Sequence, residues 1–159
     1  MTIKCAIIDD EPLALGLLES YVKKTPSLEL CGAYSSAIQA MELLNGHPVD
    51  LIFLDIQMPE LNGLEFSKII PSSTRIIFTT AFGQYALDGY KVNALDYLLK
   101  PISYTDFMTA VNKAIQWFEL CQKAENASEE IQSSENLKYI YVKSDYKLIQ
   151  IELDKILYI

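Results

Sequence analysis

The sequence predicts an α/β domain with a doubly wound, five-stranded parallel sheet. Over residues 1–123, short apolar runs alternate with longer amphipathic runs, the pattern of a parallel sheet whose two faces are covered by helices. The length of 159 residues suits one complete domain and at most a fragment of a second. Hydrophobic residues make up 50% of the chain and charged residues 21%, so the chain has enough apolar surface for a buried core.

The predicted elements follow one another in a regular strand-helix order. Strands are expected at residues 3–9, 28–34, 51–54, 75–80 and 94–99, and helices at residues 12–24, 37–45, 62–70, 84–91 and 104–123. Pro12 suits a first helical turn, and Ser36 and Ser103 are expected to cap helices. Asn45-Gly46 followed by Pro48 indicates a helix end. The apolar residues at helical spacing in the last helix are expected to face the sheet: Phe107, Val111, Ala114, Ile115 and Phe118.

The last part of the chain differs in composition. Residues 124–136 are polar, which indicates a linker, or a frayed helix end that leads into one. Residues 137–144 and 147–153 are predicted strands, and residues 156–159 begin a third. Residues 137–159 are too few for an independent core. We therefore expect a second domain that is cut at this point, or strands that pair with another chain.

Charge, hydropathy and cysteine content predict a cytoplasmic protein. No apolar run approaches the roughly 20 residues that a membrane-spanning helix needs. Cys5, Cys31 and Cys121 are odd in number and set among apolar neighbours, which favours small buried side chains in a reducing compartment over disulfide or metal roles. The net charge of −8 has the wrong sign for binding nucleic-acid phosphates or anionic lipids, so this chain is not expected to bind either directly.

Acidic residues end two of the predicted strands. Asp9, Asp10 and Glu11 follow the first strand, and Asp55 follows the third. In a doubly wound sheet of order 2-1-3-4-5 these strands are neighbours, and ligands bind beyond their carboxyl ends. Carboxylates this close raise one another's pKa unless a cation neutralises them, and an all-oxygen site favours a hard divalent ion. We therefore expect a Mg²⁺ site that leaves one carboxylate free to react.

The fourth and fifth predicted strands add a hydroxyl and an ammonium at the same edge. Thr79 and Thr80 end the fourth strand, and Lys100 follows the fifth. A carboxylate nucleophile, a metal and a cation are the parts that phosphoryl transfer requires. Each part also has a plainer interpretation: a solvated helix start, a turn at Asp55, an ordinary strand threonine or a surface lysine. We favour phosphoryl transfer because four strand ends would otherwise gather these groups by accident.

Four motifs stand at these strand ends in a fixed order: Ile8-Asp9-Asp10-Glu11, Leu54-Asp55-Ile56-Gln57-Met58-Pro59 with Gly63, Thr80-Ala81, and Tyr97-Leu98-Leu99-Lys100-Pro101. Together they resemble the receiver domain of two-component response regulators, a flavodoxin-like fold, over about residues 3–123. The resemblance implies that Asp55 accepts a phosphoryl group from the phosphohistidine of a sensor histidine kinase. It also implies a signalling domain that catalyses only its own phosphorylation and dephosphorylation.

The resemblance assigns roles to further residues. It implies that Asp10, Asp55, the backbone carbonyl of Gln57 and, through water, Asp9 hold Mg²⁺ or Mn²⁺.

Thr80 and Lys100 would bind phosphoryl oxygens. Strand alternation cannot choose between Thr79 and Thr80, so the preference for Thr80 comes from the resemblance alone. Tyr97 is similar to the family's switch aromatic, with a half-buried strand tyrosine as the plainer alternative. The bond before Pro101 is a candidate cis peptide.

A narrower resemblance concerns the output of the switch. Residues 78–87 and 92–102 are similar to the LytR/AlgR regulators, and residues 139–144 and 154–159 are similar to the start of their LytTR-type DNA-binding domain. This resemblance implies a transcription regulator that forms a homodimer on phosphorylation. The resemblance also implies that such a regulator binds DNA only through the complete output domain, not through this fragment.

Three other classes fit the sequence less well. A haloacid-dehalogenase-like phosphatase has its nucleophile in an Asp-x-Asp run after the first strand, and this chain has no room for a cap domain. A pseudo-receiver that acts as a constitutive interaction module would keep the fold without the chemistry, yet no signature residue is missing. A flavin-binding role is weaker still, because the acidic pocket would repel a flavin phosphate.

Overall fold

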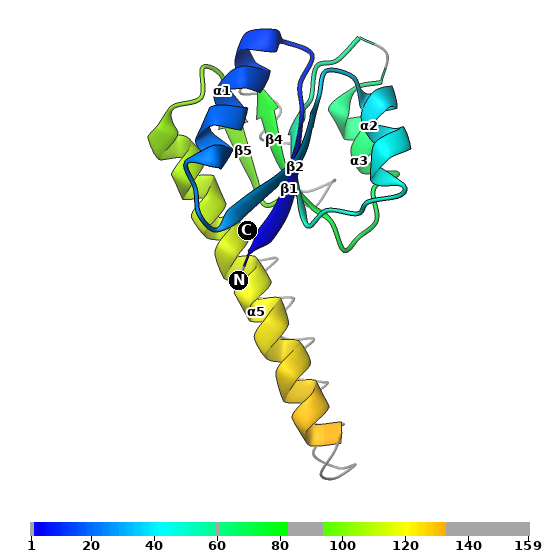
Figure 1. Cartoon of the computed structure of the whole chain (residues 1–159), viewed down its shortest axis with the longest axis vertical. Helices are drawn as coiled ribbons and strands as arrows, with labels where there is room; N and C mark the ends of the chain where they lie inside the picture. The colour runs from blue at the N-terminus through cyan, green and yellow to red at the C-terminus, as the bar shows by residue number, and fades with distance from the viewer. Residues whose placement is uncertain (1, 60, 83–93, 133–159) are drawn as a thin grey trace. The chain divides into compact units, whose positions relative to one another are not determined.

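The structure, a computed structural model, describes residues 2–59, 61–82 and 94–132. It divides into two compact units, Met1–Val111 and Asn112–Ile159, which are considered separately below. Figure 1 shows the first unit as a sheet with helices on both of its faces.

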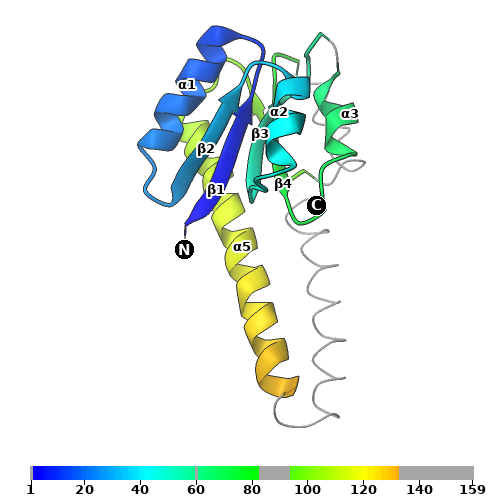
Figure 2. The ribbon, with the colours of Figure 1, turned by 45° about the vertical axis from the view of Figure 1, so that its right-hand side comes forward.

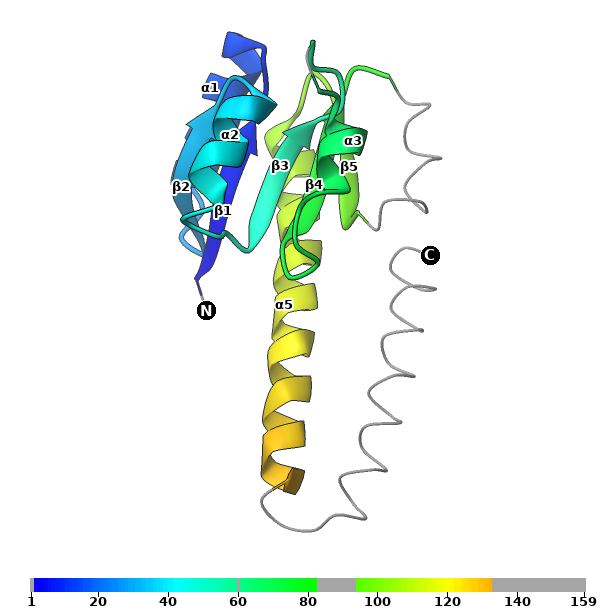
Figure 3. The ribbon, with the colours of Figure 1, turned by 90° about the vertical axis from the view of Figure 1, so that its right-hand side faces the viewer.

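The sheet has the predicted architecture. Its five strands are β1 (Ile3–Ile8), β2 (Leu28–Tyr34), β3 (Leu51–Asp55), β4 (Arg75–Thr80) and β5 (Asp96–Leu99). All neighbouring pairs are parallel, in the order β2-β1-β3-β4-β5. Figure 2 shows β2, β1, β3 and β4 in this order, and Figure 3 shows all five strands. The sequence-based prediction of a doubly wound sheet of order 2-1-3-4-5 is therefore confirmed.

The helices form two layers. They are α1 (Pro12–Lys23), α2 (Ala37–Leu44), α3 (Gly63–Ser67) and α5 (Tyr104–Gln132). Helices α2 and α3 cover one face of the sheet, and α1 with the first turns of α5 covers the other (Figure 1). The helix predicted at residues 84–91 lies outside the described residues.

Side-chain caps begin the helices where the sequence predicts them. The hydroxyl of Ser36 accepts a hydrogen bond from the backbone N–H of Gln39 at 3.2 Å, and that of Ser103 accepts one from Asp106 at 3.1 Å. Each cap satisfies a backbone donor that the first turn of a helix leaves without a partner. Pro12 opens α1, as predicted.

Strand alternation divides the core into two layers. On the α2 and α3 face, Ile52 and Leu54 of β3 pack in one buried cluster with Phe66 of α3. On the other face, Phe53 stacks on Phe107 of α5 with ring centroids 5.3 Å apart. Both faces of the central strands are therefore buried, which explains why their sequences are continuously apolar.

Helix α5 is longer than predicted. It continues to Gln132, through residues that the sequence indicates as a linker or a frayed helix end. Alanine and glutamate are frequent in this stretch and are strong helix formers, so polar composition did not prevent helix formation. Within the first unit Phe107 and Val111 are buried, as predicted, and in the second unit Ala114 is buried while Ile115 and Phe118 are half-buried.

The cysteines correct one expectation. All three are free, but only Cys5 is buried, while Cys121 is half-buried and Cys31 is exposed. Cys31 lies on β2, at the edge of the sheet, where the pairing with β1 shifts between Cys5 and Ala6. Apolar sequence neighbours did not imply burial here, because a bulge on an edge strand turns a side chain away from the core.

Among the residues that the structure describes, no helix combines the length and the apolar composition needed to cross a lipid bilayer.

Candidate functional site: an acidic edge of the sheet

Parallel pairing brings the predicted site residues to one edge. Ile8 pairs with Leu54, which places Asp9 beside Asp55, the last residue of β3. Asp55 in turn pairs with Thr79 of β4, and Thr80 pairs with Leu99, the residue before Lys100. Residues far apart in the sequence therefore meet because the carboxyl ends of parallel strands lie at the same edge.

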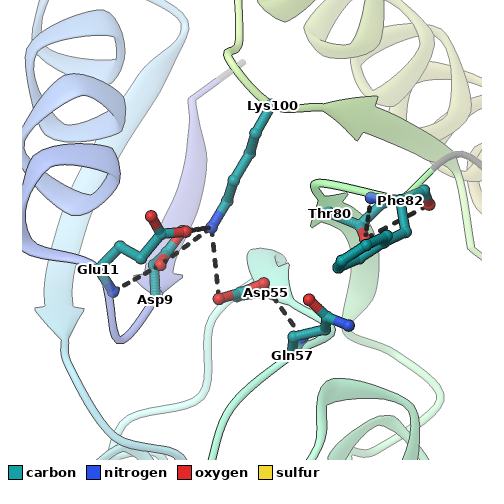
Figure 4. A network of polar contacts seen from close by, with 7 residues as sticks. All are labelled: Asp9, Glu11, Asp55, Gln57, Thr80, Phe82 and Lys100. Atoms are coloured by element: carbon teal, nitrogen blue, oxygen red, sulfur yellow. Dashed lines mark hydrogen bonds and ion pairs between the residues drawn. The ribbon is translucent and has the colours of Figure 1, made fainter.

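Lys100 lies at the centre of this edge (Figure 4). Its ammonium nitrogen is 3.0 Å from Oδ2 of Asp9 and 3.4 Å from Oδ2 of Asp55, and its closest contact is with Oε1 of Glu11. Only 12% of the Lys100 side chain is exposed. One ammonium thus bridges three carboxylates in a largely buried position, where charged pairs are weakly screened by solvent.

The turn after β1 holds two of these carboxylates in place. The backbone N–H of Glu11 donates to Oδ1 of Asp9 at 2.9 Å, so the buried Asp9 carboxylate is fixed by the start of α1. Glu11 is the N-cap residue of α1, but its side chain makes no cap hydrogen bond and points to Lys100 instead. Its side chain remains largely exposed, in contrast to Asp9.

Asp55 is only 2% exposed, and its carboxyl is electrostatically unusual. Its Oδ1 accepts a hydrogen bond from the backbone N–H of Gln57 at 3.2 Å. Burial, repulsion by Asp9 and a hydrogen bond with Asp10 together outweigh the attraction of Lys100 and raise the pKa of Asp55 to about 7. The site therefore disfavours the charged form of the Asp55 carboxyl unless a further cation approaches.

The pKa of Lys100 moves in the opposite sense to what burial alone would cause. Burial lowers it, but the hydrogen bonds to Glu11 and Asp9 and the charges of Asp9 and Asp55 raise the pKa well above its ordinary value. Lys100 is therefore a permanent cation at this site.

The donor set fits a divalent cation. One carboxylate oxygen each from Asp9, Glu11 and Asp55 lies within 4.8 Å of the others. Oxygen ligands of this kind suit Mg²⁺. Burial first, and repulsion by Asp9 second, keep the pKa of Asp55 raised in spite of Lys100, so a further cation at this edge would be stabilising. Asp10, a predicted ligand, is half-exposed and lies outside this group of three, although its side chain bonds to Asp55.

Glu11 is the site residue that the family resemblance leaves without an individual role. It belongs to the acidic run after the first strand, but the family resemblance names only its two predecessors as metal ligands. Its long side chain reaches back from the start of α1 to Lys100. The signal was its position beside Pro12, because a helix that starts there carries the Glu11 side chain to the same edge of the sheet.

The loop after Asp55 is held by a close backbone contact. The N–H of Gly63, the first residue of α3, donates to the carbonyl of Ile56 at 2.8 Å. A Cβ atom on Gly63 would overlap the backbone carbonyl oxygen of Asp55. Only glycine allows α3 to approach the loop this closely.

The two threonines of β4 differ in position. Thr80 accepts a hydrogen bond at its hydroxyl from the backbone N–H of Phe82 at 3.0 Å, in the loop at the edge of the sheet (Figure 4). Thr79 is completely buried, and neighbouring residues of a strand point to opposite faces. Thr80 is also almost completely buried, at 2% exposed, so burial does not separate the two residues, and the preference for Thr80 stays a prediction.

Two predicted features lie on β5 and just beyond it. Tyr97 is half-buried, and its ring stacks on Phe78 with centroids 5.3 Å apart. The Lys100–Pro101 peptide bond is cis.

A parallel sheet of this order with an acidic edge and one buried lysine defines a class of protein. The chain belongs to the response regulator receiver domain family, which it matches over residues 5–112. A receiver domain is a signalling phosphoacceptor domain of two-component systems.

Individual relatives agree with this family. The chain is 40% identical over 102 residues to the transcriptional regulatory protein BtsR of Escherichia coli (strain K12), covering 63% of this chain and 43% of BtsR. It is 34% identical over 116 residues to a response regulatory protein of Vibrio cholerae, covering 72% of this chain and 49% of that protein. The chain therefore spans about half the length of these relatives. Among solved structures, the response regulatory domain of mrkE from Klebsiella pneumoniae is similar with a TM-score of 0.68 and 28% identity, covering 74% of this chain and 98% of that one.

We predict that Gly63→Ala destabilises the protein by about 1 to 3 kcal/mol, because the added methyl group meets the backbone after Asp55 and forces α3 away. Gly16→Ala is the matched control. Gly16 is exposed in α1 with nothing within 4 Å of an added Cβ, so this substitution should stabilise the helix by about 0.5 to 1 kcal/mol. Urea unfolding monitored by circular dichroism measures both. Equal effects of the two substitutions would contradict the close approach.

We also predict that the stability of the metal-free protein depends on the proton of Asp55. The folded-state pKa of about 7 lies above the ordinary value of 3.8, so the contribution of this group is largest below pH 4 and is lost as the pH rises through 7. Asp55→Asn removes the charge and keeps an acceptor for Gln57. In EDTA, this variant should be more stable than the wild type at pH 8, by on the order of 2 kcal/mol.

The advantage of Asp55→Asn should shrink toward pH 4.5, and Mg²⁺ should narrow it at pH 8. Chemical unfolding at the two pH values measures the difference. An advantage that does not change with pH would show that burial of the Asp55 charge is not costly.

Proposed function

We propose that Asp55 accepts a phosphoryl group from the phosphohistidine of a sensor histidine kinase, in a Mg²⁺-dependent reaction. A carboxylate oxygen of Asp55 bonds to phosphorus while the bond from phosphorus to the imidazole nitrogen breaks. The nitrogen keeps the electron pair, and Asp55 becomes an acyl phosphate. The protein itself turns over no other substrate, so its activity is limited to its own phosphorylation and dephosphorylation.

One observation carries this proposal: the buried Asp55 carboxylate lies 3.4 Å from the Lys100 ammonium at the carboxyl edge of the sheet. A cation at this distance can stabilise the charge that develops on transferred phosphoryl oxygens. The N–H of Gln57 fixes one oxygen of the carboxylate, so the nucleophile is oriented before the reaction.

A divalent cation would complete the site. We assign it to Asp10, Asp55, the backbone carbonyl of Gln57 and, through water, Asp9, as the family resemblance implies. The close group of Asp9, Glu11 and Asp55 supports a cation at this edge. When bound, Mg²⁺ or Mn²⁺ supplies positive charge to the phosphoryl oxygens and lowers the pKa of Asp55.

In the proposal Lys100 and Thr80 are catalytic residues beside Asp55, and Thr80 and Tyr97 form the switch. Lys100 exchanges part of its contact with Asp9 and Glu11 for a phosphoryl oxygen, and Thr80 donates its hydroxyl to another oxygen. Movement of Thr80 toward the phosphoryl group leaves room for the ring of Tyr97 to turn inward. Phosphorylation thereby alters the surface that includes β5.

We further propose that the receiver controls a LytTR-type DNA-binding domain, of which residues 137–159 are the start, after a receiver of residues 1–123 and a linker of residues 124–136. The complete regulator would act in the cytoplasm as a homodimer formed on phosphorylation, and DNA would be bound only by the complete output domain. The name of the relative BtsR, a transcriptional regulatory protein, supports an output in transcription.

The decisive experiment is the intact mass of the protein after incubation with acetyl phosphate and Mg²⁺. We expect the wild type to gain one phosphoryl group, because the Asp55 nucleophile, the cation site and Lys100 are all present. The Asp55→Asn variant and an EDTA-treated sample should gain none.

A phosphoryl group on the Asp55→Asn variant would place the acceptor elsewhere. No gain in the wild type, together with no binding of beryllofluoride, would identify a pseudo-receiver that serves as a constitutive interaction module.

Dimerisation has its own test. Beryllofluoride with Mg²⁺ mimics the phosphorylated state, and we expect it to raise the sedimentation coefficient of the wild type at micromolar concentration. The Asp55→Asn variant should not respond. An unchanged wild-type coefficient, with beryllofluoride shown to be bound, would rule out a phosphorylation-dependent dimer of this chain.

A further inference from the structure

A cavity lies on the face of the sheet that α2 and α3 cover, near the amino ends of the strands, whereas Asp55 lies at their carboxyl ends. Its volume is about 170 Å³, and its walls include Met41 and Leu44 of α2, Ile52 of β3, Phe66 of α3 and Ile70 beyond α3. In Figure 3 this face of the sheet is turned toward the viewer, with α2 and α3 in front of the strands. We call this cavity the α2–α3 cavity.

The α2–α3 cavity lies near the amino ends of the strands. Two of its wall residues, Val49 and Thr74, come just before β3 and β4 respectively, whereas Asp55 is the last residue of β3. The cavity is therefore separated from the acidic edge by the length of a strand and shares no residue with it.

The walls of the cavity are suited to an uncharged ligand. None of the residues that line it is charged. The hydroxyl of Thr74 donates to the backbone carbonyl of Val49 at 2.7 Å, so this polar group is already engaged. Asn45 is the other polar side chain of the lining, and it is exposed. An ion placed here would lose its water without gaining a partner, while an apolar group would lose nothing.

The volume limits the size of the occupant. An apolar cavity of about 150 Å³ takes up a molecule the size of benzene. The α2–α3 cavity is slightly larger and is partly open, with the 57% exposed side chain of Ile69 among its lining residues. A single aromatic ring with one small substituent fits this space, and two fused rings with substituents exceed it.

We propose that the α2–α3 cavity is a binding site for a small, uncharged aromatic molecule with a single ring. The ring would lie among Leu44, Ile52, Phe66 and Ile70, and a hydroxyl substituent would reach Asn45. This proposal does not depend on phosphorylation of Asp55, so the two proposals can be tested separately.

Benzene, phenol and benzoate are the probes, titrated into the ¹⁵N-labelled chain and followed by NMR. We expect saturable shifts for benzene and phenol at amides of residues 41–49 and 66–74. Benzoate should bind at least tenfold more weakly, because its carboxylate cannot be solvated in the cavity. The two neutral ligands should also raise the unfolding temperature, since they bind only the folded state.

Two isoleucines provide matched variants. Ile70→Phe places a ring inside the cavity and should weaken phenol binding at least tenfold. Ile38→Phe makes the same change on α2 at a side chain that is 48% exposed and outside the lining, so binding should equal that of the wild type. Leu44→Phe fills the cavity from the opposite wall and replaces Ile70→Phe if that variant does not fold by circular dichroism.

Several results would overturn the proposal. The proposal is wrong if the wild type shows no saturable binding of benzene or phenol. It is also wrong if phenol binds the folded cavity-filling variant as tightly as it binds Ile38→Phe. Binding of benzoate as tight as that of phenol would also overturn the proposal, since it would indicate a polar site. Shifts confined to the acidic edge would place the ligand elsewhere.

Discussion

The ion pairs of Lys100 are the interaction on which the acidic edge depends. Asp9 and Asp55 are both almost completely buried, and two buried carboxylates without a cation would repel each other and lose their solvation. The Lys100 ammonium contacts both, together with Glu11, yet the pKa of Asp55 remains raised to about 7. The compensation is therefore incomplete. The remaining negative charge is what makes this edge attractive to a divalent cation and leaves Asp55 ready to change its charge state.

The parallel sheet supplies the geometry that this electrostatic arrangement needs. Asp9, Asp55 and Lys100 each follow a different strand, and crossover connections return every strand in the same direction, so all three residues arrive at one edge. The contact of Gly63 with the backbone of Asp55 fixes the loop after β3. Burial of both sheet faces, by the Phe53–Phe107 pair on one side and Phe66 on the other, keeps the strand ends in register. The packed sheet thus positions a charged site in which Lys100 only partly neutralises the carboxylates.

The sequence-based predictions succeeded where a structural feature depends on residues close together in the sequence. Strands β2 and β4 begin and end where predicted, and the caps at Ser36 and Ser103 form, because hydrophobic patterning and capping act over a few residues. Predictions of helix length and of side-chain burial agreed less well with the structure. Helix α3 is shorter than predicted, α5 is longer, and Cys31 is exposed despite apolar sequence neighbours. These features depend on what packs against an element, which a local pattern does not contain.

For the part of the chain that the structure describes, the sequence alone predicted the order and type of the elements. It also placed Asp9, Asp55, the pair Thr79 and Thr80, and Lys100 at strand ends, because apolar periodicity indicates where each strand stops. Only the tertiary structure decided how these groups are connected. It brought the Glu11 side chain to Lys100, left Asp10 outside the closest group of carboxylates, and joined the Thr80 hydroxyl to the backbone N–H of Phe82. The physical reason is that ion pairing and desolvation depend on distances of a few ångströms between distant parts of the chain, and these distances exist only once the chain has folded.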